Sequence, residues 1–192
     1  MSPQSAAILD LFRSTGAYLN GHFRLTSGLH SAEYLQCALV LQHPAHAERL
    51  GRQLAALLPA AVDAVASPAL GGLIIGHEVA RALGVRFIFT ERGPDGKMTL
   101  RRGFQVSAGE RLAVIEDVMT TGGSTREVVA LLRAGGAEPV VAGSIVDRSG
   151  GAADVGAPRV SLVTMNVESW QPEDCPQCRA GAPVTKPGSR PV

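Results

Sequence analysis

Between residues 62 and 165, short apolar runs alternate with stretches in which apolar residues recur at helical spacing. Helices are predicted at 72–84 and 125–137, with Gly84 and Gly135 near their ends. Strands separated by helices at this rhythm form a parallel sheet through right-handed crossovers. We therefore expect an α/β fold, a parallel sheet with helices on both faces. The predicted strands are 62–67, 85–90, 111–118, 139–148 and 159–165.

Smaller elements are expected on either side of this core. Apolar spacing predicts helices over 4–16 and 44–58, the second beginning at Pro44. Alternation around a turn at Ser27-Gly28 predicts short strands between residues 21 and 40. The tail, 171–192, contains five prolines and is predicted to be irregular.

Composition excludes several classes of protein. An apolar fraction of 45% with 18% charged residues argues against disorder in this chain of 192 residues. The net charge of +1 argues against a nonspecific nucleic-acid binder, which needs a basic face. No apolar run approaches the ~20 residues that cross a bilayer, so we expect no membrane association. Three cysteines make no disulfide framework, which favours a cytoplasmic protein.

One segment combines adjacent carboxylates with glycines where a strand passes into a helix. Residues 116–124 read Glu-Asp-Val-Met-Thr-Thr-Gly-Gly-Ser, and they begin at the end of the apolar run 111–118. In open parallel sheets, ligands bind beyond the carboxyl ends of the strands. Glycine-rich backbone N–H groups and a helix N-terminus bind phosphate well. The segment therefore predicts a phosphate-binding loop.

The carboxylates of Glu116 and Asp117 favour a sugar phosphate as the ligand, because they would repel a bare phosphate. They can accept hydrogen bonds from ribose hydroxyls while the loop binds the 5′-phosphate. The alternative is an ordinary turn with a helix cap at Ser124 or Thr125, and the acidic pair favours the binding site over it. The segment has neither the Gly-Lys-Ser/Thr of a Walker loop nor the order of a dinucleotide fingerprint, since its carboxylates precede its glycines.

The segment EDVMTTGGS (116–124) resembles the phosphoribosyl pyrophosphate signature of the type I phosphoribosyltransferases. The stretch GHFRLTSGLHSAEYLQ (21–36) resembles the hood of the orotate phosphoribosyltransferases, and VDRSGG (146–151) resembles a later segment of the same enzymes. The resemblance implies a type I phosphoribosyltransferase-like parallel sheet flanked by helices, with a small N-terminal hood. It further implies one domain, 1–192, with a core of 60–165 and a hood of roughly 1–40 plus the tail 166–192.

The resemblance implies a glycosyltransferase of the pentosyl class. It would transfer ribose 5-phosphate from phosphoribosyl pyrophosphate to orotate, giving orotidine 5′-phosphate and pyrophosphate, a step in de novo UMP synthesis. Mg²⁺ is the implied cofactor and a homodimer with a shared active-site loop the implied assembly. Because Mg²⁺ usually binds through substrate oxygens and water, we assign no metal-ligating residues in the chain. Two alternatives stay open: another acceptor base (a purine, xanthine or uracil), or a non-catalytic regulator that senses phosphoribosyl pyrophosphate.

Site residues follow from the resemblance. Asp117 is implied in catalysis as well as in binding. The orotate-binding residues are Thr26, Thr120 and Arg148, with Arg148 pairing with the orotate carboxylate; its alternative is a surface ion pair with Asp147 or a neighbour. The implied phosphoribosyl pyrophosphate-binding residues are Glu116, Asp117, Val118, Met119, Thr120, Thr121, Gly122, Gly123 and Ser124, with Leu70 and Gly71 from the turn 67–72.

The polar stretch 91–104 is too rich in glycine and charge to be core, and it falls where the family has a mobile catalytic loop. The resemblance implies that Arg92 contacts pyrophosphate and that Lys97 closes over it, both as catalytic residues. Lys97 is one of only two lysines among 18 basic residues, which favours function over ordinary surface charge. Arg101 and Arg102 are weaker candidates for the same role.

The chain also departs from the family pattern. Glu91-Arg92 replaces an Arg-Lys pair, and the following loop has no histidine. Gly71 stands where the family often has a lysine, and Thr26 stands where some members have a lysine that contacts orotate. The basic residues around pyrophosphate are therefore arranged differently here.

Cys175-Pro-Gln-Cys178 is a single CxxC motif with no second pair and no histidines near it in the sequence. Since a structural zinc site needs four ligands, we interpret the motif as a local turn or a redox-labile pair. The five histidines are scattered. Of these, only His30 is expected to face the base.

Overall fold

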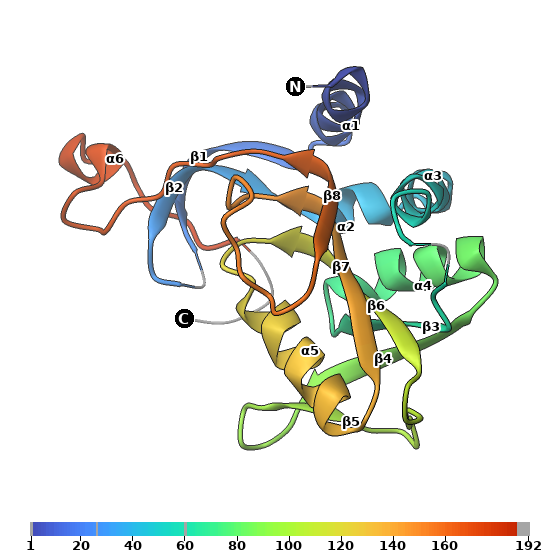
Figure 1. The fold of residues 1–192 in the computed structure, drawn as a ribbon. Coiled ribbons are helices and arrows are strands. Elements are labelled where there is room, and N and C mark those ends of the chain that lie inside the picture. The colour runs from blue at the N-terminus through green and yellow to red at the C-terminus, as the bar shows by residue number, and fades with distance from the viewer. Residues whose placement is uncertain (1, 26, 60, 188–192) are drawn as a thin grey trace. The chain divides into compact units, whose positions relative to one another are not determined.

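The computed structural model describes residues 2–25, 27–59 and 61–187 (Figure 1). Its contacts divide the chain into two units. The terminal unit consists of residues 1–40 and 166–192, and the sheet unit consists of residues 41–165. Thr26, which we assigned to orotate binding, lies outside the described residues.

The sheet unit is built on a six-stranded sheet with the order β5-β4-β3-β6-β7-β8. Every neighbouring pair is parallel except β4 and β5. The predicted α/β fold with a parallel sheet is confirmed. The strands are β3 (Ala64–Pro68), β4 (Arg86–Arg92), β5 (Met98–Leu100), β6 (Arg111–Met119), β7 (Glu138–Asp147) and β8 (Arg159–Thr164).

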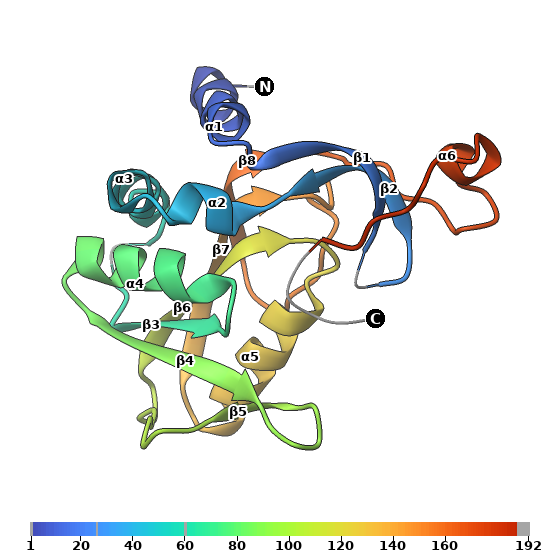
Figure 2. The same cartoon turned by 180° about the vertical axis from the view of Figure 1, so that it is seen from behind.

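Helices cover both faces of this sheet. Figures 1 and 2 show α3 (Pro44–Ala55) and α4 (Gly72–Leu83) on one face and α5 (Gly123–Ala134) on the other. On the α5 face, Val128 and Leu132 join a buried cluster with Val114 of β6. On the other face, a Cβ on Gly143 would lie 2.8 Å from Ile115 and 3.4 Å from Leu54. A glycine in β7 therefore gives α3 room to pack.

The chain leaves the middle of the sheet in opposite directions. From β3 it passes through α4 to β4 on one side, and from β6 it passes through α5 to β7 on the other. The neighbouring strands β3 and β6 thus form the topological switch point, where ligands bind in open α/β sheets. The turn 69–71 and the loop 120–122 follow these two strands.

The stretch 91–104 is more ordered than we expected. Strand β4 extends to Arg92 and pairs with β5 in an antiparallel hairpin whose turn is 93–97. Met98 is buried in the core, and Phe104 packs against the same cluster. The expectation that the whole stretch lies outside the core is wrong, because the apolar side chains at 98, 100 and 104, which follow the polar turn, pack in the core.

The terminal unit contains α1 (Pro3–Ser14), which is capped by Ser2, and the antiparallel hairpin of β1 (Tyr18–Arg24) and β2 (His30–Leu35). The strand pattern expected up to residue 40 is interrupted by α2 (Cys37–Leu41). The tail includes one short helix, α6 (Pro176–Arg179), which the sequence did not predict. Among the described residues, no helix is both long and apolar enough to traverse a bilayer.

Candidate functional site

The loop that the sequence predicted as a phosphate site runs from the end of β6 to the start of α5. Gly122 has φ +77° and is the N-cap of α5. A Cβ at this position would lie 2.6 Å from Val155 Cγ1, so the loop packs tightly on the segment 153–155. Thr120, Thr121 and Gly123 are exposed and Ser124 is half-buried, whereas Thr125 is buried in the interior.

The turn after β3 lies against the acidic pair. A Cβ on Gly71 would be 2.6 Å from Asp117 Oδ1, so only a glycine lets this turn approach the carboxylate so closely. The Ala69–Leu70 peptide is cis, and Leu70 is 71% exposed. The structure therefore brings together Leu70, Gly71 and the segment 116–124, which the sequence grouped in one site.

Two helices begin at this site without a capping side chain among the described residues. The N-cap of α4 is Gly71 and that of α5 is Gly122, neither of which has a side chain to accept a hydrogen bond. The alternative of a cap at Ser124 or Thr125 is thus wrong. The first N–H groups of a helix have no acceptor within the helix and carry its positive dipole end. The starts of α4 and α5 thus each leave N–H groups that could bind an anion, and Gly71 at the start of α4 lies against Asp117.

The two carboxylates of the site have raised proton affinities. Burial, followed by the charge of Asp117, raises the pKa of Glu116 well above its ordinary value. Burial also raises the pKa of Asp117, although its carboxylate accepts a 2.8 Å hydrogen bond from the Val118 N–H, which acts in the opposite direction. Two adjacent carboxyl groups with raised pKa values bind hydroxyl groups or a cation readily, since either one relieves their repulsion.

Arg148 lies directly beside the loop. Its backbone N–H donates to the Met119 carbonyl at 2.8 Å, and the residue is 8% exposed. Asp147 is instead paired with Arg159 at 2.9 Å and accepts from both the N–H and the hydroxyl of Ser149. Arg148 is thus buried at the loop, which speaks against its being a surface charge. Sequence reasoning missed Arg159 and Ser149, which hold this part of the site.

The two basic residues predicted to act on pyrophosphate differ in their surroundings. Arg92 donates to both carboxylate oxygens of Glu127, on α5, at 2.8 and 3.3 Å, and also to the Gly96 carbonyl at 2.5 Å. Lys97 is exposed in the hairpin turn, and its ammonium group has no partner within the described residues. Arg92 must leave Glu127 to reach a ligand, whereas Lys97 is free to move. Glu127 carried no signal in the sequence.

Of the weaker candidates, Arg102 pairs with Glu91 through two hydrogen bonds of 2.8 and 2.9 Å. Arg102 also has φ +57°, and its guanidinium lies 5.7 Å from the centre of the Phe89 ring. Arg101 is exposed. The contacts of Arg102 fix the base of the hairpin, a structural role.

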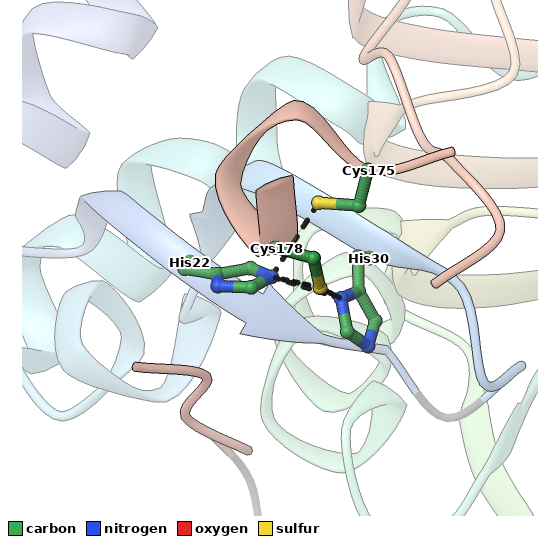
Figure 3. Close-up of side chains that lie close together, drawn as sticks. All are labelled: His22, His30, Cys175 and Cys178. Carbon is green, nitrogen blue, oxygen red and sulfur yellow. Dashed lines mark hydrogen bonds between the residues drawn. The ribbon is translucent and has the colours of Figure 1, made fainter. Parts of the chain in front are cut away.

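Our interpretation of Cys175 and Cys178 needs correction. Figure 3 shows the two cysteines facing His22 and His30, so the motif does have histidines beside it in space. His30 Nδ1 lies 3.2 Å from Cys178 Sγ, and the residue is buried. The four residues could hold a metal ion, although the sequence led us to assign no metal ligands.

Comparisons with known proteins agree with these features. Residues 39–176 match the phosphoribosyl transferase domain family. The orotate phosphoribosyltransferase of Pelotomaculum thermopropionicum is 55% identical over 186 residues, covering 96% of this chain and 97% of that protein. The orotate phosphoribosyltransferase of Heliobacterium modesticaldum is likewise 55% identical, and the match covers 95% of this chain and 97% of that protein. The crystal structure of orotate phosphoribosyltransferase from Aeropyrum pernix is 26% identical with a TM-score of 0.69, covering 82% of this chain and 93% of that one.

Proposed function

Because the chain belongs to the phosphoribosyl transferase domain family, and within it to the orotate phosphoribosyltransferases, we propose that it makes orotidine 5′-phosphate from orotate and phosphoribosyl pyrophosphate. The bond between C1 of the ribose and the pyrophosphate oxygen breaks, and a bond from C1 to a ring nitrogen of orotate forms. Pyrophosphate leaves with the electron pair of the broken bond, and the ring nitrogen of orotate loses its proton to water or to the leaving pyrophosphate. The product is the precursor of UMP, which gives the reaction its place in pyrimidine synthesis.

The sugar donor binds across the two helix N-termini. The 5′-phosphate binds to the loop 120–124 at the start of α5, where exposed hydroxyls and backbone N–H groups are available. Pyrophosphate binds to the turn containing Leu70 and Gly71 at the start of α4. Glu116 and Asp117, between these two sites, accept hydrogen bonds from the ribose hydroxyls. Val118 and Met119 connect the carboxylates to the loop.

The donor set between the two anion sites suits Mg²⁺. The carboxylates of Glu116 and Asp117 offer only oxygen ligands, which Mg²⁺ prefers. These residues would hold the ion, directly or through substrate hydroxyls and water. When bound, Mg²⁺ would neutralise charge on the departing pyrophosphate. The chain itself positions the sugar and limits the access of water.

The hairpin turn also supplies positive charge that stabilises the negative charge on the leaving pyrophosphate. Lys97 closes over pyrophosphate. It is able to do so because its ammonium group is exposed and has no partner within the part of the chain described. Arg92 also binds pyrophosphate, after its guanidinium has left the carboxylate of Glu127. Such closure excludes water from a cation-like transition state that water would otherwise trap.

Orotate is recognised next to the loop. Arg148 is buried beside Met119, where its guanidinium can form two parallel hydrogen bonds with a carboxylate. Thr120, one residue further along, contacts the ring. Thr26 is assigned to the same base from the sequence alone.

The observation that carries this proposal is the acidic pair flanked by two helix N-termini without capping side chains. The test is release of pyrophosphate with orotate, uracil, adenine, hypoxanthine and xanthine as separate acceptors. We expect turnover with orotate. Turnover with a purine but not with orotate would identify the purine as the acceptor, and no turnover with any base would favour a sensing regulator. Asp117→Asn should raise the KM for the sugar donor. Its matched control is Asp63→Asn, which keeps an oxygen to accept from the N–H of Arg111, the first residue of β6.

A homodimer is part of the proposal. A hollow of about 400 Å³ on the sheet unit is lined by Leu73, Ile74, His77, Glu78, Phe87 and Phe89, and Ile74 is 45% exposed. A second copy would cover these side chains, and Ile74→Asp should then give monomers in sedimentation experiments. If Lys97 acts on the partner's site, mixing Lys97→Ala with Asp117→Asn subunits should restore part of the activity. A cytoplasmic location is also proposed, since Cys37, Cys175 and Cys178, all within the described residues, form no disulfide.

A further inference from the structure

Four potential metal ligands from both ends of the chain meet in the terminal unit (Figure 3). His22 lies in β1 and His30 begins β2, whereas Cys175 caps α6 and Cys178 lies within it. Their ligand atoms all lie within 4.8 Å of one another. No part of the proposed transferase site uses these side chains, so their gathering needs a separate explanation.

The spacing between the ligand atoms suits a tetrahedral ion. With zinc bonds of about 2.0–2.1 Å to nitrogen and 2.3 Å to sulfur, tetrahedral angles place nitrogen and sulfur ligands about 3.6 Å apart. The Sγ atoms of Cys175 and Cys178 are both 3.5 Å from His22 Nε2, and Cys178 Sγ is 3.2 Å from His30 Nδ1. The two nitrogens are 2.8 Å apart and would have to separate by about half an ångström to share a tetrahedral ion.

The surrounding structure aims the side chains at a common point. The pairing of β1 with β2 is irregular between Asn20 and Phe23, and such a bulge redirects the side chain of His22. The other ring nitrogen of His22, Nδ1, lies 2.9 Å from the Ala182 carbonyl. A hydrogen bond there places the proton on Nδ1 and leaves the Nε2 lone pair for a metal, which is the usual outer contact of a metal-bound histidine.

Three of the four ligands lie in the interior. His22, His30 and Cys175 are buried, whereas Cys178 is exposed. A cation between the two sulfur atoms would stabilise them as thiolates side by side.

We propose that His22, His30, Cys175 and Cys178 bind one Zn²⁺ ion in a closed, structural site. Two imidazole nitrogens and two thiolates form a donor set that tetrahedral Zn²⁺ prefers over Mg²⁺ or Ca²⁺. Four protein ligands leave no open position for water or substrate, so the ion would be structural. Each thiol releases its proton on binding, and the two thiolates balance the charge of the ion.

The ion would fasten the tail to the hairpin. Backbone hydrogen bonds already join them: Thr185 N–H donates to the His22 carbonyl at 2.8 Å, and His30 and Trp170 exchange two bonds of 2.8 and 2.9 Å. The side chain of Gln177 adds a 2.8 Å bond to the Gly21 carbonyl. A metal bond between residues so distant in the chain would close a long loop and stabilise this arrangement.

Metal analysis of the untagged full-length protein, purified under reducing conditions, tests the proposal without reference to its activity. We expect about one zinc per chain. Cobalt substitution should give the intense visible bands of tetrahedral Co²⁺ and a thiolate-to-metal charge-transfer band. Cys178→Ser and His30→Ala should lose most of the zinc and both spectral features, whereas Cys37→Ala and His77→Ala, which change residues outside the cluster, should retain them.

Several results would overturn the proposal. One is protein that stays free of zinc after reconstitution with Zn²⁺ and reductant. Another is a cobalt spectrum without thiolate charge transfer, a measurement on the unaltered chain that does not depend on the variants folding. A third is a Cys178→Ser variant with a full zinc content, and a fourth is a disulfide between Cys175 and Cys178 in protein purified without oxygen. Loss of orotate turnover with the zinc site intact would instead count against the proposed function alone.

Discussion

Replacement of Gly122 by alanine tests whether the phosphate loop depends on a backbone that only glycine adopts easily. Gly122 has φ +77°, and a Cβ there would lie 2.6 Å from Val155 Cγ1 and 3.3 Å from Ala153 Cβ. Both neighbours are buried, so neither can move without disturbing the segment 153–155. The added methyl group thus meets conformational strain and steric overlap at once.

The two effects can be estimated separately. A left-handed conformation costs an alanine about 1–2 kcal/mol relative to its preferred conformations. Forcing one extra carbon into a packed region costs about 1–3 kcal/mol. Together they predict that Gly122→Ala lowers the free energy of unfolding by about 2–5 kcal/mol. In a chain of this size, each kcal/mol lost is expected to lower the melting temperature by about 2–4 °C.

Gly123 provides a matched control in the same loop. Its φ is not positive, and the nearest atom to an added Cβ is Thr121 Oγ1 at 3.7 Å, an ordinary contact. Gly123→Ala should therefore leave the urea unfolding midpoint unchanged or raise it slightly, since alanine favours the first turn of a helix. Gly122→Ala should also raise the KM for the sugar donor. Equal unfolding midpoints for the two variants would refute the argument from backbone conformation.

Three further predictions concern charged residues. Lys97→Ala should lower kcat by about 10²–10³-fold with little change in donor KM, because the ammonium group acts on charge that develops during bond cleavage; steady-state kinetics decides, and an equal loss in both parameters would indicate ground-state binding. The raised pKa of Glu116 means that its contribution to folding is largest below the unfolded-state pKa of about 4.3 and is lost as the pH rises through the folded-state pKa. Glu116→Gln should thus melt at a higher temperature than the wild type at alkaline pH, with the difference shrinking towards acid pH; a pH-independent difference would contradict this. Asp147→Ala should lower the free energy of unfolding by about 3 kcal/mol, because it leaves Arg159 without its buried partner; urea titration measures the loss, and a change within error would show that the pair contributes nothing.

Local sequence patterns were sufficient for much of the sheet unit. The apolar run ending at Glu116 and Asp117, followed by hydroxyl residues and glycines, indicated both β6 and the loop that starts α5, because each depends on neighbours in the chain. Met98 was misjudged, since a few apolar residues in a stretch rich in glycine and charge give only a weak periodic signal. Its burial depends on pairing of β5 with β4, which is a tertiary contact.

The sequence by itself determined the α/β fold, the position of the acidic pair and the glycines of its loop, since backbone preference and apolar period act over a few residues. Only the tertiary structure placed Gly71 against Asp117 and paired Arg92 with Glu127. It also gathered His22 and His30 beside a CxxC motif more than a hundred residues away in the chain. Such contacts join residues that are distant in the chain. They depend on where the crossover connections and the tail lie in the folded structure, which no short-range pattern encodes.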